Sequence, residues 1–121
     1  MGDPTTLRRV YGRRCGHKLR AGQAELIERL LPQVAVPEEG PLSSQILFGD
    51  ERPLHFEIGF GGGGHLGYRA DLLPDHGFIG AEPFLNGVAG ALAHIRDGHL
   101  ANVRLHMGDA LEILERLPDS S

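Results

Sequence analysis

Residues 54–73 carry the clearest pattern of hydrophobic and polar positions in the chain. Hydrophobic and polar side chains alternate from 54 to 58, as they do in a short strand. Glycine then occupies five of the six positions from 59 to 64. From about His65 to Leu73 hydrophobic residues recur at helical spacing, and Pro74 ends the segment. The pattern predicts a strand, a glycine loop and a helix, an order that in α/β proteins places a nucleotide-like ligand over the end of the strand.

Two further strands are predicted after this unit, each followed by a helix. Residues 77–82 (GFIGAE) form the first, and residues 103–107 alternate as expected for a strand with one polar face. Pro83 suits the first turn of the helix between them, and Gly98 suits its C-cap. The order β-α-β-α-β-α predicts an α/β fold with three parallel strands and flanking helices, which is half of a Rossmann-like doubly wound sheet. The first strand of such a half sheet has an uncovered edge.

The chain before residue 54 is less regular. Residues 1–20 lack hydrophobic periodicity and contain several glycines, so we expect a flexible arm. Residues 22–31 place their hydrophobic side chains on one stripe, which predicts a short amphipathic helix ended by Pro32. Residues 34–51 are rich in proline, glycine and serine and are interpreted as a connector, with a brief extended piece at Gln45–Phe48.

The charge of the chain changes sign at the end of this arm. Residues 1–20 carry six basic side chains and one acidic side chain, a net charge of plus 5, whereas residues 21–121 carry a net charge of minus 9. A basic arm on an acidic body indicates a polyanionic partner such as nucleic acid. A solvated tail without a partner would have the same composition.

The length and composition bound the class of protein. With 121 residues, 40% of them hydrophobic, the chain is long enough for a single domain with one core. It has no apolar run of membrane-spanning length and no signal-peptide pattern, so we expect a soluble cytoplasmic protein. Cys15 stands alone and the seven histidines form no H-x-x-x-H pair, so no disulfide framework and no metal site are predicted. No catalytic Ser-His-Asp or Cys-His arrangement is identifiable.

The glycine loop fits two different ligand-binding patterns. Gly59, Gly61 and Gly64 fit the dinucleotide pattern G-x-G-x-x-G. Glu57 followed by Gly59, Gly61 and Gly63 fits the pattern E-x-G-x-G-x-G of S-adenosylmethionine-dependent methyltransferases. The spacing of the glycines alone does not distinguish the two patterns. A glycine-rich surface turn that binds no ligand would show the same spacing.

Three carboxylates stand at the ends of the three predicted strands. Glu57 lies at the end of the first, Glu82 closes the second, and Asp109 follows the third. Because the carboxyl ends of parallel strands meet at one rim of a sheet, these groups suit a ligand with an ammonium group, a ribose diol and an adenine. Each also has a purely structural interpretation. Asp109 in particular, with Glu112 three residues later, forms a capping-box pattern for the last helix.

Three segments of the sequence, FEIGFGGGGHL, GFIGAEPFLNGV and NVRLHMGDA, resemble the bacterial tRNA (guanine-N7)-methyltransferases, which methylate a guanine in the tRNA variable loop. The basic start RRVYGRRCGHKLRAGQ is similar to the N-terminal arm of that family. The resemblance extends from about Arg8 to Pro118. It implies that the fold is the N-terminal half of a Rossmann-like methyltransferase sheet.

The resemblance also implies a cofactor, a partner and their residues. The cofactor is S-adenosyl-L-methionine, and the matching positions that would bind it are Glu57, Gly59, Gly61, Gly63, Glu82 and Asp109. The partner is tRNA, and the basic residues of the arm that would contact it are Arg8, Arg9, Arg13 and Arg14.

The second half of the family's sequence, with its Pro-Asp-Pro-Trp-Pro segment, has no counterpart after Ser121. We therefore expect residues 21–121 to form a partial S-adenosylmethionine-binding domain whose C-terminal half is absent, and which binds cofactor without a complete catalytic site. Two alternatives stay open. One is a nicotinamide-dependent Rossmann oxidoreductase domain, and the other is a non-catalytic cofactor-binding half-domain that pairs through its uncovered first strand.

Overall fold

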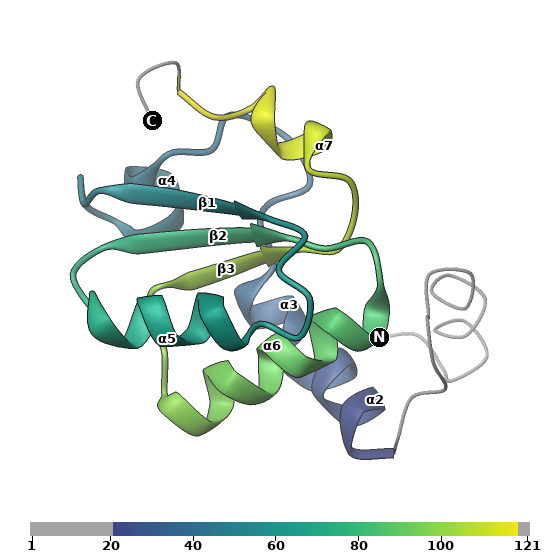
Figure 1. Cartoon of the computed structure of the whole chain (residues 1–121). Coiled ribbons are helices and arrows are strands. Elements are labelled where there is room, and N and C mark those ends of the chain that lie inside the picture. The colour runs from purple at the N-terminus through teal and green to yellow at the C-terminus, as the bar shows by residue number, and fades with distance from the viewer. Residues whose placement is uncertain (1–20, 119–121) are drawn as a thin grey trace.

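The structure, a computed structural model, describes residues 21–118. Its centre is a parallel sheet in the order β1-β2-β3, formed by β1 (Leu54–Ile58), β2 (Gly77–Ala81) and β3 (Val103–His106) (Figure 1). The register pairs the first residue of β1 with the first residue of β2. All five residues of β2 are buried, because both faces and both edges of this central strand are covered. The predicted α/β fold with three parallel strands is confirmed.

One face of the sheet is covered by α5 (Gly64–Leu72) and α6 (Leu85–Gly98), and α2 (Ala21–Arg29) packs against α6 (Figure 1). Phe78 of β2 points into the hydrophobic core on this side. The helices and strands that surround Phe78 contribute apolar side chains with almost no exposed surface: Leu66, Ala70, Val88, Leu92, Val103 and Leu105. This larger core holds the helix that follows the glycine loop firmly against the sheet.

The opposite face of the sheet carries a smaller core. Successive side chains of a strand point to opposite faces, so Ile79 of β2 lies on the other side from its neighbour Phe78. It packs with Leu42 of the connector, Leu47 of α4 (Ser44–Phe48) and Ile113 of α7 (Leu111–Leu114). The connector and the last helix therefore cover this face together.

The segment predicted to be extended at 45–48 is helical, and that prediction was wrong. The hydroxyl oxygen of Ser43 accepts a hydrogen bond from the backbone N–H of Ile46 at 3.2 Å, which caps the start of α4. Gly49 ends the helix in the left-handed region at a φ of 83°. A serine before the segment and a glycine after it are helix-capping signals. They favour a helix here, although so short an apolar segment is also typical of a strand.

Two prolines also act differently from the prediction. Helix α2 already ends at Arg29, and Pro32 lies at the beginning of the short helix α3 (Leu31–Val34), where a missing N–H costs no hydrogen bond. Pro83 lies outside α6, which begins at Leu85 after an extended Phe84.

Asn102, the residue before β3, is a buried polar residue with 4% of its surface exposed. Its side-chain Nδ2 donates to the carbonyl oxygens of Ala70, Leu73 and His76 at 3.0, 3.1 and 3.0 Å. These carbonyls belong to the end of α5 and to the turn into β2, and the first would otherwise be buried without a partner. One amide group thus ties the end of α5 to the beginning of two strands.

Within residues 21–118, β1 pairs only with β2, so the outer edge of β1 is unpaired. Ile58 at its end is 62% exposed. At the opposite edge of the sheet, Ala35 forms a parallel bridge with Leu105 of β3. In this part of the chain no helix has the length and hydrophobicity that a membrane span requires.

Candidate functional site

The glycine loop, residues 59–63, joins β1 to α5. Gly59, Gly61 and Gly63 have φ angles of 58, 60 and 82°, in the left-handed region that other residues rarely adopt. A Cβ atom on Gly63 would lie 2.6 Å from the Cα atom of Ala91 in α6. The loop therefore needs glycine both for its turn and for its direct contact with α6. The predicted glycine loop is therefore present, and its backbone geometry explains why these positions are glycine.

Glu82 follows β2 and holds the glycine loop. Only 5% of its surface is exposed, and its carboxylate accepts two backbone hydrogen bonds. Oε1 accepts from the N–H of Gly61 at 2.9 Å, and Oε2 accepts from the N–H of Phe84 at 3.1 Å. Two oriented N–H groups compensate part of the cost of burying the charge. Glu82 thus links the loop after β1 to the start of α6.

The backbone of Glu82 also continues the sheet beyond β2. Its N–H donates to the carbonyl of His106 at 3.0 Å, and its carbonyl accepts from the N–H of Gly108 at 3.0 Å. Asp109 comes directly after this pair, so the segments that carry Glu82 and Asp109 lie side by side at the carboxyl end of the sheet.

Glu57 lies in β1, one residue before its end, and its side chain is 19% exposed. Its Oε1 lies 3.2 Å from Nδ1 of His65 in the first turn of α5. The His65 side chain is 71% exposed, so it reaches the carboxylate from the solvent side. The carboxylate therefore faces a partner that can carry positive charge.

Asp109 is exposed and caps α7. Its Oδ1 accepts from the N–H of Leu111 at 2.9 Å, and Oε1 of Glu112 accepts from the N–H of Asp109 at 3.1 Å. The predicted contacts between Asp109 and the first turn of α7 form, but the helix begins at Leu111 with Ala110 as its N-cap, and the Asp109 side chain bonds the N–H two residues on. The same Glu112 oxygen lies 2.7 Å from Nε2 of His106, so the cap is also tied to the end of β3.

The sequence analysis missed the contribution of α6 to this site. Cβ atoms on Gly87 and Gly90 would lie 2.5 and 2.7 Å from the carbonyl oxygens of Gly61 and Gly62. The loop backbone therefore rests on a side of α6 formed by Gly87, Gly90 and Ala91, whose side chains are no larger than a methyl group. The signal was visible as two glycines three residues apart in the first half of the predicted helix, a spacing that places both on one face. The contact of Glu57 with His65 was missed as well.

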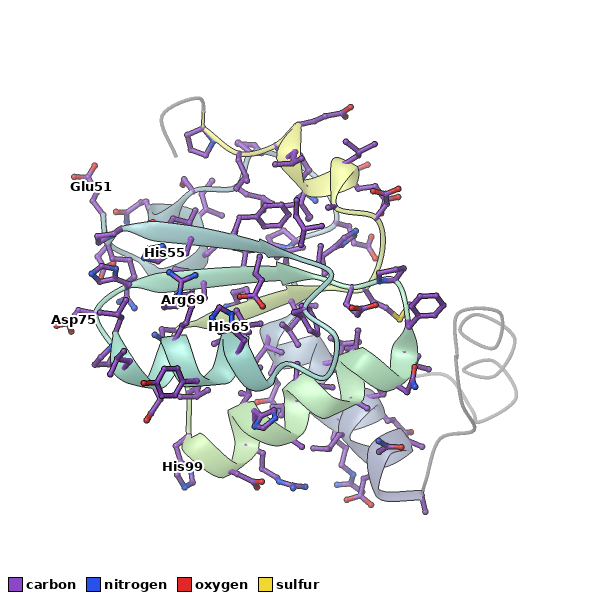
Figure 2. All side chains as sticks on the ribbon, viewed as in Figure 1. Glu51, His55, His65, Arg69, Asp75 and His99 are labelled. Carbon is purple, nitrogen blue, oxygen red and sulfur yellow. The ribbon has the colours of Figure 1, made fainter. Side chains whose placement is uncertain are left out.

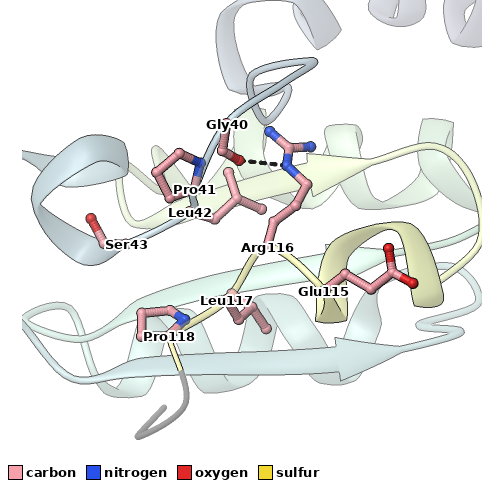
Figure 3. A pocket seen from close by; sticks show the side chains of 8 residues that line it. All are labelled: Gly40, Pro41, Leu42, Ser43, Glu115, Arg116, Leu117 and Pro118. Carbon is pink, nitrogen blue, oxygen red and sulfur yellow. Dashed lines mark hydrogen bonds between the residues drawn. The ribbon is translucent and has the colours of Figure 1, made fainter.

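Two surface hollows formed by described residues lie away from these carboxylates. The larger, of about 580 Å³, lies between the connector and the segment after α7 and is lined by Gly40, Pro41, Leu42, Ser43, Glu115, Arg116, Leu117 and Pro118 (Figure 3). Arg116 crosses this region, donating to the carbonyls of Gly40 at 2.7 Å and Pro37 at 2.5 Å. The smaller, of about 380 Å³, lies between α5 and α6. Neither of these two hollows is lined by Glu57, Glu82 or Asp109.

The remaining predicted residues lie outside the described part of the chain. Arg8, Arg9, Arg13 and Arg14 belong to residues 1–20, which the structure does not describe. Among residues 21–118, no three His, Cys, Asp or Glu side chains are grouped closely enough to hold a metal ion. The candidate site consists of loop N–H groups and three carboxylates, an arrangement that suits binding of a polar, cationic ligand.

Comparison with known proteins defines the class. The model of a protein family described as "Putative methyltransferase" matches residues 51–121, which include the glycine loop and all three carboxylates. The chain belongs to this methyltransferase family. Membership favours the methyltransferase pattern of Glu57 and the glycines over the dinucleotide pattern.

Individual relatives carry a more specific name. The chain is 62% identical over 120 residues to the tRNA (guanine-N(7)-)-methyltransferase of Erythrobacter litoralis, an alignment that covers 99% of this chain and 52% of the relative. It is 61% identical over 125 residues to the protein of the same name from Novosphingobium aromaticivorans, again with 99% and 52% covered. The corresponding protein of Sphingopyxis alaskensis is 62% identical over 125 residues, with 99% and 53% covered. The chain thus spans about half the length of the curated relatives it matches.

Proposed function

We propose that this chain is the cofactor-binding half of a tRNA (guanine-N7)-methyltransferase, which transfers a methyl group from S-adenosylmethionine to guanine N7 in the tRNA variable loop. The observation that carries the proposal is the contact between Glu82 and the glycine loop. A buried carboxylate at the end of β2 is held against a loop of backbone N–H groups after β1. The names of the relatives, at 61–62% identity, support the choice of tRNA as substrate.

In this proposal the chain binds the cofactor through groups that surround the carboxyl end of the sheet. Gly59, Gly61 and Gly63 keep the loop low enough for the cofactor to lie against its backbone. Glu82 accepts hydrogen bonds from the ribose hydroxyls, for which each carboxylate oxygen keeps a further lone pair. Glu57 attracts the ammonium group of the methionine part, and Asp109 lies at the third strand end, toward the base.

Methyl transfer to guanine N7 requires few catalytic groups from this half of the enzyme. Guanine N7 carries a lone pair and no proton, so the attack on the sulfonium methyl needs no general base at the nucleophile. The methyl group moves from sulfur to N7, and S-adenosylhomocysteine leaves with the electron pair of the broken C–S bond. The protein must hold the methyl group in line with N7 and exclude water. We assign no catalytic residue within these 121 residues.

The basic arm would supply the contact with tRNA, which would place the protein in the cytoplasm. Replacing Arg8, Arg9, Arg13 and Arg14 with alanine should weaken tRNA binding. It should also lower the slope of log affinity against log salt concentration by about 3, because fewer counterions are released. An unchanged slope would show that the arm does not contact the phosphate backbone.

Calorimetric titration of the chain with S-adenosylhomocysteine tests the cofactor part of the proposal. We expect binding to the unmodified chain, loss of binding in Glu82→Ala, and unchanged binding in the matched control Glu115→Ala, whose side chain is exposed at the far hollow. A folded chain that binds no S-adenosylhomocysteine would contradict the proposal.

Activity is tested by joining the chain to the second half of the Erythrobacter litoralis relative. The joined protein should methylate tRNA, and it should not methylate a tRNA in which the target guanine is replaced by 7-deazaguanine, which has no N7. Methylation of the deaza substrate would contradict the proposed target atom.

A further inference from the structure

Glu57 of β1 and His65 of α5 face each other across the ends of the glycine loop, with Oε1 of Glu57 3.2 Å from Nδ1 of His65. In the described part of the chain, His65 is the only side chain that contacts the Glu57 carboxylate through a hydrogen bond or an ion pair. Glu82 differs, because it is buried and each of its oxygens already accepts a hydrogen bond from a backbone N–H group of the protein. Of these two carboxylates, Glu57 is therefore the one arranged to receive an exchangeable cation.

We propose that His65 controls the affinity for the amino-acid end of the cofactor by competing with its ammonium group for Glu57. The inference rests on the proposed function, because it requires a ligand that carries an ammonium group and binds over the glycine loop. Imidazolium and ammonium are both cations, and a carboxylate whose charge is already neutralised by one of them attracts the other less strongly. His65 is thus a specificity-determining residue that acts on the ligand through Glu57.

The competition depends on the charge of the histidine. Histidine side chains change charge between about pH 5 and pH 8, whereas an aliphatic ammonium group keeps its charge over that range. An imidazolium in contact with Glu57 neutralises the carboxylate and weakens its attraction for the ligand's ammonium group. A neutral imidazole leaves the negative charge of the carboxylate available to the ammonium group. Affinity for an ammonium-bearing ligand should therefore rise as the pH increases.

The other charged groups near His65 are few in the described structure. Arg69 lies one turn further along α5, with its guanidinium 5.3 Å from the ring centre of Phe78 (Figure 2). From α6, the ring of His94 lies against α5, where its Nε2 would stand 3.9 Å from a Cβ on Gly64. Arg69 is cationic and His94 can become so, and neither offers His65 a second carboxylate. In the described structure Glu57 is therefore the acidic partner of His65.

Two ligands separate this effect from other titrations. S-Adenosylhomocysteine carries the amino-acid part, whereas 5′-methylthioadenosine keeps the adenosine and sulfur but has no ammonium group. We expect the affinity of the unmodified chain for S-adenosylhomocysteine to rise several-fold from about pH 5.5 to about pH 7.5, the range in which histidine loses its proton. The affinity for methylthioadenosine should change much less over the same range.

Two variants complete the experiment. His65→Gln should bind S-adenosylhomocysteine with little dependence on pH, since glutamine carries no charge. The matched control His99→Asn changes an exposed histidine at the other end of α6 and should keep the pH dependence of the unmodified chain (Figure 2). Asparagine is chosen because residue 99 has a φ of 52°, which asparagine tolerates.

The outcomes distinguish the inference from the proposed function. Failure of both ligands to bind at any pH would overturn the proposed function. Binding of S-adenosylhomocysteine with the same pH dependence in His65→Gln as in the unmodified chain would overturn the role of His65 and leave the proposed function standing. If the affinity for methylthioadenosine depended on pH as strongly as the affinity for S-adenosylhomocysteine does, the role of His65 would also be overturned.

Discussion

The carbonyl oxygen of Gly61 lies 2.5 Å from the point where a Cβ atom would stand on Gly87. The glycine loop and α6 therefore meet backbone to backbone, with no room for a methyl group between them. The same Cβ would lie 3.0 Å from Cγ of Glu82, the residue whose carboxylate holds the loop. Helix α6 thus fixes both the loop and the carboxylate that binds it.

Gly87→Ala should disturb the loop more than the rest of the fold. We expect a loss of about 1–3 kcal/mol in the free energy of unfolding, the usual cost of forcing a methyl group into a closed contact. The affinity for S-adenosylhomocysteine should fall by about tenfold or more, which corresponds to about 1.4 kcal/mol. Denaturant titration and calorimetry measure the two effects.

The control for this variant is Gly22→Ala in α2, where a Cβ would meet nothing within 4 Å. Alanine favours helix over glycine by about 1 kcal/mol, so this change should stabilise the chain slightly and leave ligand affinity unchanged. Equal behaviour of the two variants would mean that the loop does not need the glycine face of α6.

Asn102→Ala should destabilise the chain by about 2–3 kcal/mol, because a buried carbonyl left without a hydrogen bond costs about 1–3 kcal/mol. In this variant the carbonyls of Ala70 and His76 lose the Asn102 donor, whereas the carbonyl of Leu73 loses it but keeps the N–H of His76. The control Gln33→Ala removes an amide that donates to one exposed carbonyl, that of Arg29, and should change stability by less than about 0.5 kcal/mol. Thermal unfolding of both variants gives the comparison, and similar midpoints would count against this role of Asn102.

The stability of the chain should fall as the pH decreases, partly because of His55. Partial burial, then Arg69 and His76, lower the pKa of His55 below its usual value. The unfolded chain therefore binds this proton more readily than the folded chain. The corresponding stability is complete above the ordinary histidine pKa of about 6.5 and is lost as the pH falls toward the lowered value.

The measurement is the unfolding midpoint at about pH 7.5 and at about pH 5.5, on either side of the ordinary histidine pKa. We expect a larger decrease for the unmodified chain than for His55→Gln, which cannot take up the proton. The exposed control His99→Asn should keep the full decrease. The same decrease in His55→Gln as in the unmodified chain would refute the assignment.

Asp109 has a structural role that can be separated from the proposed contact with cofactor. Asp109→Ala removes the cap of α7 and should cost about 1 kcal/mol of stability. Asp109→Asn keeps an oxygen that can accept from the N–H of Leu111, so its stability should change little. If the carboxylate also acts on the cofactor, Asp109→Asn alone should weaken S-adenosylhomocysteine binding. Unchanged binding of S-adenosylhomocysteine in Asp109→Asn would show that Asp109 only caps the helix and does not act on the cofactor.

The unpaired edge of β1 should promote self-association. Ile58 at that edge is 62% exposed, and unpaired strand edges pair readily with other strands. We expect light scattering to show larger species as the concentration of the chain increases, and Ile58→Lys to reduce them. The control Ile46→Lys changes an isoleucine of α4 that is 53% exposed and should leave the association unchanged. A monomer at all concentrations would rule out edge pairing.

The sequence predicted the elements whose local requirements are strong. The glycine loop was recognisable because Gly59, Gly61 and Gly63 need positive φ angles, and β2 because a central strand is apolar throughout. The capping box at Asp109 was recognisable because it depends only on residues three positions apart.

What the sequence did not predict depends on contacts between distant segments or on weak local signals. The burial of Glu82 against Gly61 joins residues 21 positions apart, and only the packing of α6 against the loop brings them together. Helix α4 was missed because a stretch of five residues fits a strand as well as a helix until its caps at Ser43 and Gly49 are considered.

The hydrogen bonds of Arg116 have a consequence for the order of folding. They tie the end of the described chain to Pro37 and Gly40, which lie 79 and 76 residues earlier, and the N–H of Leu42 donates to the carbonyl of Arg116 at 2.8 Å. Closing so long a loop costs chain entropy, which the packing of the connector and α7 on the sheet offsets. We therefore expect the connector to become ordered late, although it lies early in the sequence. It should dock after the three strands have formed, and it should be among the first segments to detach when the protein unfolds.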